Sequence, residues 1–142
     1  MLHYTLLHPE ILAALASAGH GARVLIADGN YPLATLSNPA AERVFLNLAP
    51  GVLTVAEVLR VLIDAIPIEA AQGMMPDQGP EPPVFRAYRE ILPDDLKLQA
   101  VGRFDFYEAA RQSDTALAIA TGDQRLYANL LLTIGVVPPE NT

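Results

Sequence analysis

The stretch Val24-Leu25-Ile26-Ala27, followed at once by Asp28-Gly29-Asn30-Tyr31-Pro32, decides how this chain folds. A short continuous apolar run is typical of a strand that is covered on both faces, as in a parallel sheet. The segment that follows it is a dense turn signal, which ends the strand. Asp28 is therefore expected at the carboxyl end of a buried strand, where ligands bind in open α/β sheets.

Helices and strands alternate outward from this stretch. Pro9 and Glu10 suit the start of a helix over 9–18, and Gly19 suits its end. Thr54 and Glu57 form a capping-box pattern ahead of a helix over 55–66. The remaining expected elements are strands over 43–48, 68–75, 98–101, 116–120 and 130–134, and helices over 84–92 and 104–112. This alternation predicts an α/β layered fold, and residues 1–142 are expected to form a single domain.

The composition limits the classes of partner. Apolar residues make up 51% of the chain and charged residues only 18%, so part of the surface is expected to be buried between subunits. The formal net charge of −7 and the absence of a basic run argue against nucleic acid and against an anionic membrane surface. Because the chain has no cysteine, disulfides, thiolate chemistry and cysteine-ligated metals are excluded.

No targeting or membrane segment is expected. The N-terminal residues lack the basic and apolar regions of a secretory signal. The most apolar long stretch, residues 52–68, is interrupted by Glu57, Arg60 and Asp64, whereas a spanning helix needs about 20 predominantly apolar residues. The sequence therefore predicts a cytoplasmic protein.

His20 is the most informative single residue. It lies between Gly19 and Gly21, which allow unusual backbone angles and a close approach. An imidazole has a pKa of about 6.5, which suits a general acid or base at neutral pH. A helix C-terminal cap is the alternative interpretation, since a protonated histidine is favourable there.

Polar residues also follow the other expected strands. Tyr127 and Asn129 alternate with one residue between them, so in extended backbone both side chains would point the same way and could bind hydroxyl groups. Asp28 could orient His20 or accept a hydroxyl proton, but Asp-Gly is also an ordinary turn former. Tyr127 could simply pack over a strand, and Arg103 could pair with a surface acid.

Several established motifs are missing. The three histidines have no metal-ligand spacing, so no metal site is expected. The chain has no phosphate-binding glycine loop and no Gly-x-Ser-x-Gly elbow, which removes support for nucleotide hydrolysis and for serine-hydrolase chemistry.

Taken in order, the motifs resemble the fucose mutarotase and ribose pyranase family over almost the whole chain. No single motif is specific to this family, but the full set of motifs in this order is. The stretches that carry the resemblance are His8-Pro9-Glu10, Leu15-Ala16, Gly19-His20-Gly21, Ala27-Asp28-Gly29-Asn30-Tyr31-Pro32, Arg103-Phe104-Asp105-Phe106-Tyr107-Glu108, Thr121-Gly122, Tyr127-Ala128-Asn129-Leu130 and Gly135-Val136.

The resemblance implies a cofactor-independent isomerase that interconverts cyclic forms of a monosaccharide. It implies a three-layer α/β/α fold around a largely parallel sheet, assembled into a ring, commonly a decamer, with sites near subunit contacts. By the family pattern, His20 is the catalytic acid, and the sugar is bound by Asp28, Arg103, Tyr127 and Asn129. In the mechanism that we expect, His20 protonates the ring oxygen, Asp28 positions it or takes the opposing proton, and Tyr127 shares the proton transfer.

The sugar expected from the resemblance is L-fucose or a related 6-deoxy or galacto-configured sugar. Arg103-Phe104 and Phe106-Tyr107-Glu108 resemble the fucose branch, and no histidine lies beyond His20, whereas ribose pyranases tend to carry one in the middle motif. Ala22 and Gly29 depart from the residues common in the family. A D-ribose pyranase, a non-catalytic sugar-binding or accessory protein and a purely structural ring-forming protein remain the alternatives.

Overall fold

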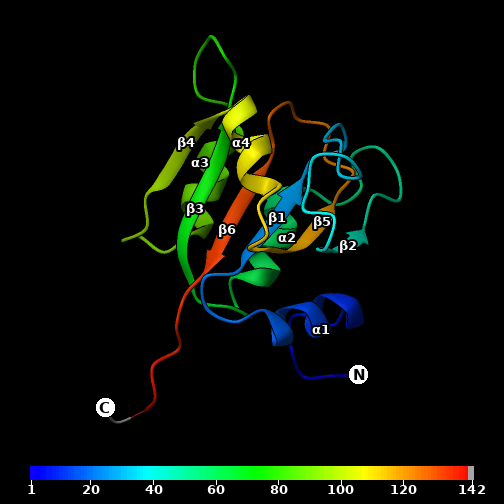
Figure 1. Ribbon diagram of the computed structural model, residues 1–142, viewed down its shortest axis with the longest axis vertical. Helices are drawn as coiled ribbons and strands as arrows, with labels where there is room; N and C mark the ends of the chain where they lie inside the picture. The colour runs from blue at the N-terminus through cyan, green and yellow to red at the C-terminus, as the bar shows by residue number, and fades with distance from the viewer. Residues whose placement is uncertain (141–142) are drawn as a thin grey trace.

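The computed structural model describes residues 1–140, in which helices and strands alternate as expected (Figure 1). The helices are α1 (Pro9–Ala18), α2 (Val55–Leu62), α3 (Val84–Ile91) and α4 (Arg103–Ala110). The strands are β1 (Arg23–Ala27), β2 (Glu42–Phe45), β3 (Ile68–Met75), β4 (Leu98–Gly102), β5 (Thr115–Ala120) and β6 (Leu130–Ile134).

The six strands form one sheet in the order β2-β5-β1-β6-β3-β4. The pairings of β2 with β5, β5 with β1 and β3 with β4 are parallel, so the expected largely parallel sheet is confirmed. Strand β6 runs antiparallel to both of its neighbours. The connection over 121–129 holds no helix that could carry the chain back along the sheet, so β6 starts at the edge where β5 ends. This loop therefore crosses the carboxyl end of β1.

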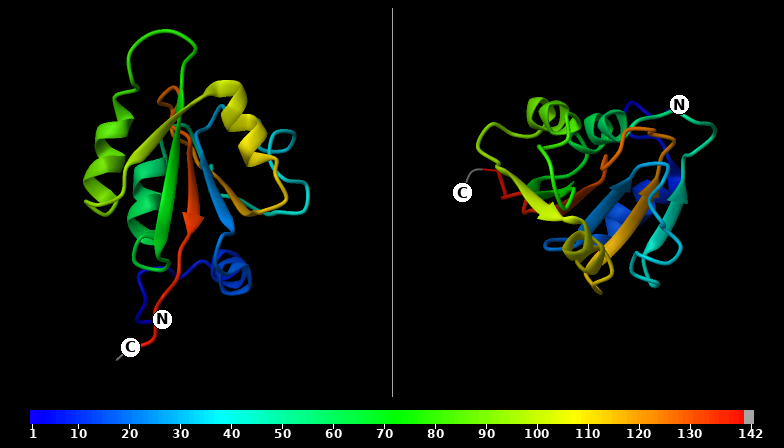
Figure 2. Two further views of the ribbon diagram at one scale, coloured as in Figure 1. Left: turned by 60° about the vertical axis from the view of Figure 1, so that its left-hand side comes forward. Right: turned by 90° about the horizontal axis from the view of Figure 1, so that it is seen from above.

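Helices cover both faces of the sheet, which confirms the three-layer arrangement (Figure 2). Helices α2 and α3 pack on one face, and α1 adds Ile11 to the same apolar cluster at the amino ends of the strands. Helix α4 packs on the opposite face, where Phe106 and Ala110 meet Leu25, Met74 and Leu131.

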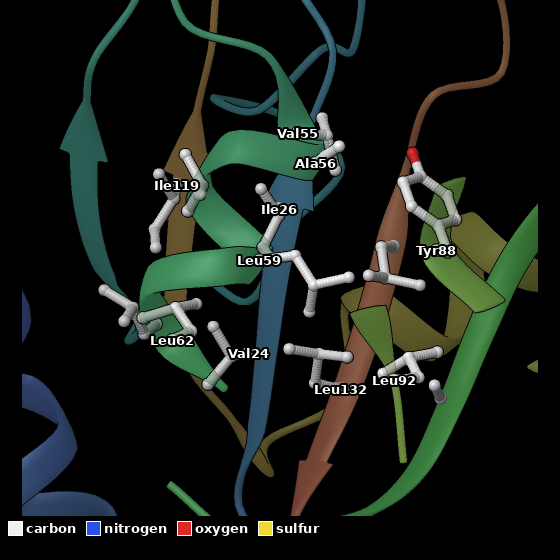
Figure 3. Packing of buried hydrophobic residues seen from close by; sticks show 14 of the residues in the cluster. Val24, Ile26, Val55, Ala56, Leu59, Leu62, Tyr88, Leu92, Ile119 and Leu132 are labelled. Carbon is white, nitrogen blue, oxygen red and sulfur yellow. The ribbon is translucent and has the colours of Figure 1, made fainter. Parts of the chain in front are cut away.

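Strand β1 lies at the centre of this packing. Val24 and Ile26 face α2 and α3 (Figure 3), whereas Leu25 and Ala27 belong to the apolar cluster on the α4 side. All four residues are fully buried. The continuous apolar run is thus covered on both sides, as the sequence predicted. No helix within residues 1–140 is long and apolar enough to cross a bilayer.

The local end signals are confirmed in detail. The Thr54 hydroxyl accepts the Glu57 N–H at 3.2 Å, and the Glu57 carboxylate accepts the Thr54 N–H at 2.7 Å, which closes the capping box. Gly19 ends α1 at a φ of 77°, an angle that side-chain-bearing residues rarely adopt.

Two elements end three or four residues earlier than the sequence predicted. Strand β2 ends at Phe45 because Leu48 N–H turns back to the carbonyl of Leu46. Helix α2 ends at Leu62, and tighter turns continue the chain to Ile66. In both places the apolar pattern continues along the sequence after the regular backbone hydrogen bonds of the element have ended.

Candidate active site

A pocket of about 210 Å³ opens at the carboxyl ends of β1 and β4, beneath the loop that crosses from β5 to β6. Four residues predicted from the sequence line it together, although they come from three distant segments: Asp28, Arg103, Tyr127 and Asn129. The other lining residues are Asn30, Tyr31, Met74, Tyr107 and Leu126. The pocket therefore joins hydroxyl-binding groups to an aromatic and aliphatic wall.

Asp28 is held deep in this pocket with only 5% of its surface exposed. Its carboxylate accepts the Asn30 N–H at 2.9 Å and the Asn129 amide at 3.2 Å. Burial raises the pKa of Asp28 above its ordinary value, while hydrogen bonds from the backbone of Asn30, Tyr31 and Ala128 and from the Asn129 side chain oppose the rise. A carboxylate with a raised pKa is a better proton acceptor near neutral pH.

Tyr127 and Asn129 reach the pocket by a different route from the one the sequence predicted. Extended backbone was expected, but Tyr127 adopts a φ of 61°, in the left-handed region. The Asn129 N–H bonds back to the Tyr127 carbonyl at 2.8 Å, so the chain turns between them. Both side chains line the pocket because of this turn, and neither residue lies in a strand.

Arg103 is the first residue of α4 and points over two aromatic rings. Its guanidinium lies 5.3 Å from the ring centroid of Phe104 and 5.6 Å from that of Tyr107. Its Nε also donates to the Tyr107 hydroxyl at 3.2 Å. Since Nε is one of several N–H donors of a guanidinium, others remain for a ligand.

Tyr107, Tyr31 and Met74 also line the pocket, although the sequence did not predict them as site residues. Tyr107 lies one helical turn after Arg103, so helical spacing could have identified it. Tyr31 packs edge-on against Tyr107, with the ring centroids 5.4 Å apart. Met74 comes from β3, and no local sequence signal ties that strand to the end of β1.

His20 lies at the other end of the sheet. Its backbone neighbour Gly21 donates to the carbonyl of Ile134, the last residue of β6, whereas Asp28 bonds to Asn129 just before β6 begins. The strand β1 separates the two ends by roughly 17 Å. The expectation that Asp28 orients His20 is therefore wrong within one chain.

The partner of His20 is Glu69 instead, at 3.0 Å from Nε2 to Oε2. Both side chains are largely exposed, at 57% and 45%. His20 is also not a helix C-terminal cap through its side chain, because its ring nitrogen faces Glu69. The imidazole is thus presented to the outside of this chain.

A second, larger cavity of about 420 Å³ shares Asn30 with the pocket and is also lined by Gly29. Its buried acid, Asp123, is already engaged by Arg125 at 2.7 Å and by the Val55 N–H at 3.0 Å. These contacts lower the pKa of Asp123 against the effect of burial, which makes it a structural carboxylate. Within residues 1–140 no three histidine or acidic residues gather as a metal site would require.

Comparisons with known proteins identify the family of this chain. The model of the RbsD / FucU transport protein family matches residues 1–137. A fucose mutarotase of Danio rerio is 31% identical over 96% of this chain and 93% of its own length. An L-fucose mutarotase of Haemophilus influenzae is 26% identical, covering 93% of each chain.

Solved structures share the fold. The fucose mutarotase of Streptococcus pneumoniae in complex with L-fucose superimposes with a TM-score of 0.81 at 26% identity, covering 97% of this chain and 100% of that one. RbsD of Bacillus subtilis in complex with D-ribose gives a TM-score of 0.80 over 97% of this chain and 100% of that one. At 19% identity, this second likeness concerns the fold alone.

Proposed function

The chain belongs to the RbsD / FucU transport protein family, and from that premise we propose that it is a sugar mutarotase, an isomerase that interconverts the anomers of a monosaccharide. The observation that carries the proposal is the convergence of Asp28, Arg103 and Tyr127 on one pocket. Hydroxyl-rich ligands need such donors and acceptors, and the same groups serve proton transfer.

Anomer interconversion requires the hemiacetal ring to open and close again. The bond from the anomeric carbon to the ring oxygen breaks as the ring oxygen gains a proton and the anomeric hydroxyl loses one. Asp28, whose burial raises its pKa, accepts the hydroxyl proton. After rotation about the adjacent C–C bond, the ring closes on the other carbonyl face and both protons return. Acid–base assistance of this kind is worth about 10²–10⁴-fold in rate.

The acid that serves the ring oxygen is His20 of a neighbouring copy. His20 cannot reach the pocket of its own chain, and its exposed ring is open to another molecule. A homo-oligomer in which the amino end of one sheet meets the carboxyl-end pocket of the next would bring both groups to one sugar. Tyr127, whose side chain lines the pocket, shares the proton transfer. As part of this proposal, the copies assemble into a ring-shaped decamer, and the protein is cytoplasmic.

L-fucose is the proposed sugar. The curated relatives are fucose mutarotases, and the structure from Streptococcus pneumoniae holds L-fucose. The wall formed by Tyr31, Met74 and Leu126 offers apolar contact for the methyl group of a 6-deoxy sugar. A D-ribose pyranase is the second candidate, supported by the likeness to Bacillus subtilis RbsD in fold.

The first experiment is proton NMR exchange spectroscopy between anomeric signals at equilibrium, with L-fucose, D-ribose and D-glucose. Exchange faster than in buffer, strongest for L-fucose, is the expected result. The strongest acceleration with D-ribose would instead make the chain a ribose pyranase. A folded protein that binds a sugar without accelerating its exchange would be a binding protein and would contradict the proposal.

Sharing of the site between copies has its own test. Asp28→Asn and His20→Ala would be produced separately and as a co-expressed mixture. In a shared site, each inactive chain supplies the group that the other lacks, so random mixing should restore about a quarter of the wild-type rate. A mixture no more active than its components would show that both groups act within one chain.

A further inference from the structure

Both side-chain amide hydrogens of Asn129 are engaged by the protein itself. A primary amide has two N–H donors and one carbonyl oxygen with two lone pairs. In Asn129 the amide nitrogen donates to Asp28 Oδ2 at 3.2 Å and to the sulfur of Met74 at 3.6 Å, and its oxygen accepts the Asp28 N–H at 2.8 Å. The residue is 3% exposed. No amide hydrogen is left for a sugar.

These partners also fix which way the amide points. Turned by 180°, it would place its N–H group against the N–H of Asp28 and its oxygen against the Asp28 carboxylate. Both contacts would then be repulsive in a buried place, where unpaired polar groups are costly. The amide therefore has one favourable orientation, and in it both donors serve the protein.

Other pocket residues keep their donors free. Arg103 uses Nε for Tyr107, and a guanidinium has further N–H groups. The Tyr107 hydroxyl accepts that bond and retains its own hydrogen. Arg103 and Tyr107 are also more exposed than Asn129. The sugar hydroxyls thus have better partners than Asn129.

The same loop holds the backbone on both sides of Asp28. The Ala27 carbonyl accepts the N–H of Thr121 at 3.0 Å and its hydroxyl at 2.8 Å, and the Gly29 N–H donates to the Asp123 carbonyl at 2.8 Å. A side chain at Gly29 would begin 3.2 Å from that carbonyl, which leaves little room for one. The loop over 121–129 therefore clamps the residue before Asp28, Asp28 itself and the residue after it.

We propose that Asn129 is a positioning residue, which acts on the sugar through Asp28 and is not itself a hydroxyl ligand. Its amide holds the Asp28 carboxylate in place and favours the ionised form that accepts a proton. The role in catalysis rests on the proposed function, whereas the contact between Asn129 and Asp28 does not. This assignment differs from the direct sugar contact that the family resemblance implies for Asn129.

A hydrogen bond donated to a carboxylate lowers its pKa, so loss of the Asn129 amide should raise the pKa of Asp28 further. Burial raises the pKa of Tyr31 and of Tyr88 above the ordinary tyrosine value, so neither titrates in the range of Asp28. Asp123 has a lowered pKa and is already ionised. The titratable or charged groups that face Asp28 or interact with it are Tyr31, Tyr88, Arg103, Tyr107 and Tyr127.

The test is a carboxyl carbon-13 NMR titration of the free protein, with the Asp28 signal assigned by its loss in Asp28→Asn. In Asn129→Ser, the pKa of Asp28 should rise, and the acid limb of the kcat/KM profile for L-fucose should move to higher pH with it. KM well above that limb should stay within about twofold of wild type, since no hydroxyl contact is lost. An unchanged Asp28 pKa with KM raised about tenfold would make Asn129 a direct ligand and overturn the proposal.

Met74→Leu is the matched control. It keeps the volume of the side chain and removes only the sulfur acceptor, so the pKa of Asp28 should stay at the wild-type value. The wild-type protein supplies a second measurement if Asn129→Ser does not fold. The Asn129 side-chain amide signals should then follow the titration of Asp28, and signals that follow sugar concentration alone would overturn the proposal.

Failure of the proposed function and failure of the Asn129 proposal give different experimental results. If the wild-type protein accelerates the exchange of no sugar, the proposed function fails. The carbon-13 titration needs no sugar and would still decide whether Asn129 controls Asp28.

Discussion

The two ends of the sheet present their polar residues in opposite ways. At the carboxyl end, Asp28 and Asn129 are almost entirely buried and bonded to one another. At the amino end, His20 and Glu69 form a pair that is about half exposed. A buried polar group must find partners within its own chain, since an unpaired one is costly. An exposed polar group is hydrated by water and remains accessible to a partner from another molecule.

This contrast teaches how the two ends contribute. The carboxyl end is pre-organised by the fold, so its residues affect both stability and the proposed chemistry. The amino end holds an exposed ion pair of a kind that adds about 0–1 kcal/mol to stability, so His20 can serve function at little cost to folding. Substitutions at the two ends of the sheet should therefore have different effects on stability and on activity.

The largest effect is expected from Asp28→Asn, which removes the proton acceptor of the buried end. The rate constant for L-fucose anomer exchange should fall by about 10³-fold. NMR exchange spectroscopy measures it, and circular dichroism checks that the variant is folded. A rate within a few-fold of wild type would show that Asp28 is not the base.

His20→Ala should lower the same rate by about 10²-fold without changing the melting temperature. The reason is that the imidazole is exposed and its pair with Glu69 lies at the surface. Glu69→Gln is the matched control, which keeps the shape of the partner and should retain most of the activity. A large loss of stability in His20→Ala would remove the contrast between the two ends.

Asp123→Ala should lower the free energy of unfolding by about 2 kcal/mol, because the buried carboxylate accepts charge-assisted bonds from Arg125 and the first N–H of α2. The control at the other end is Asp114→Ala, which removes a partly exposed pair with Arg23 and should cost no more than about 0.5 kcal/mol. Urea denaturation measures both. Equal losses would mean that burial does not separate the two ends.

Tyr127→Phe removes one hydroxyl at the mouth of the pocket. We expect KM for L-fucose to rise about fivefold, which corresponds to one hydrogen bond, with a comparable or smaller fall in kcat. The melting temperature should stay at the wild-type value, because Tyr127 is only partly buried. Unchanged KM and kcat would remove Tyr127 from the site.

The smallest effect concerns the pH dependence of stability. Burial raises the pKa of Asp28 in the folded state, so the folded protein binds this proton more tightly than the unfolded chain does. Ionised Asp28 therefore lowers stability as pH rises from its unfolded pKa through its folded pKa. Because the amide introduced by Asp28→Asn cannot ionise, the stability of this variant relative to wild type should increase across that window. Urea melts at pH 3 and pH 7 test the sign.

Much of this architecture could be predicted from local patterns. The run 24–27 predicted a buried strand, Thr54 and Glu57 predicted a helix start, and the strands over 68–75 and 130–134 have the predicted bounds. These signals are local, since apolar periodicity and caps depend on neighbours within a few residues. Four residues of the pocket were predicted from the family resemblance and from the rule that ligands bind at the carboxyl ends of the strands in α/β sheets. They are Asp28, Arg103, Tyr127 and Asn129, which all come after a strand in the sequence.

Three features required the tertiary structure. His20 and Asp28 are close in sequence, but an extended strand converts that short separation into opposite ends of the sheet. Met74 and Tyr31 enter the pocket through strand order and loop packing, for which the sequence carries no local signal. The engagement of both Asn129 amide hydrogens depends on contacts with residues 101 and 55 positions away.

The sequence by itself therefore determined the elements, the layered α/β class and the identity of the polar residues at the strand ends. The tertiary structure alone decided which of those residues face one another, because strand order and direction set distances that sequence separation does not. It brought Asp28, Arg103, Tyr127 and Asn129 into one pocket. It left His20 exposed at the amino end of the sheet, with Glu69 as its partner.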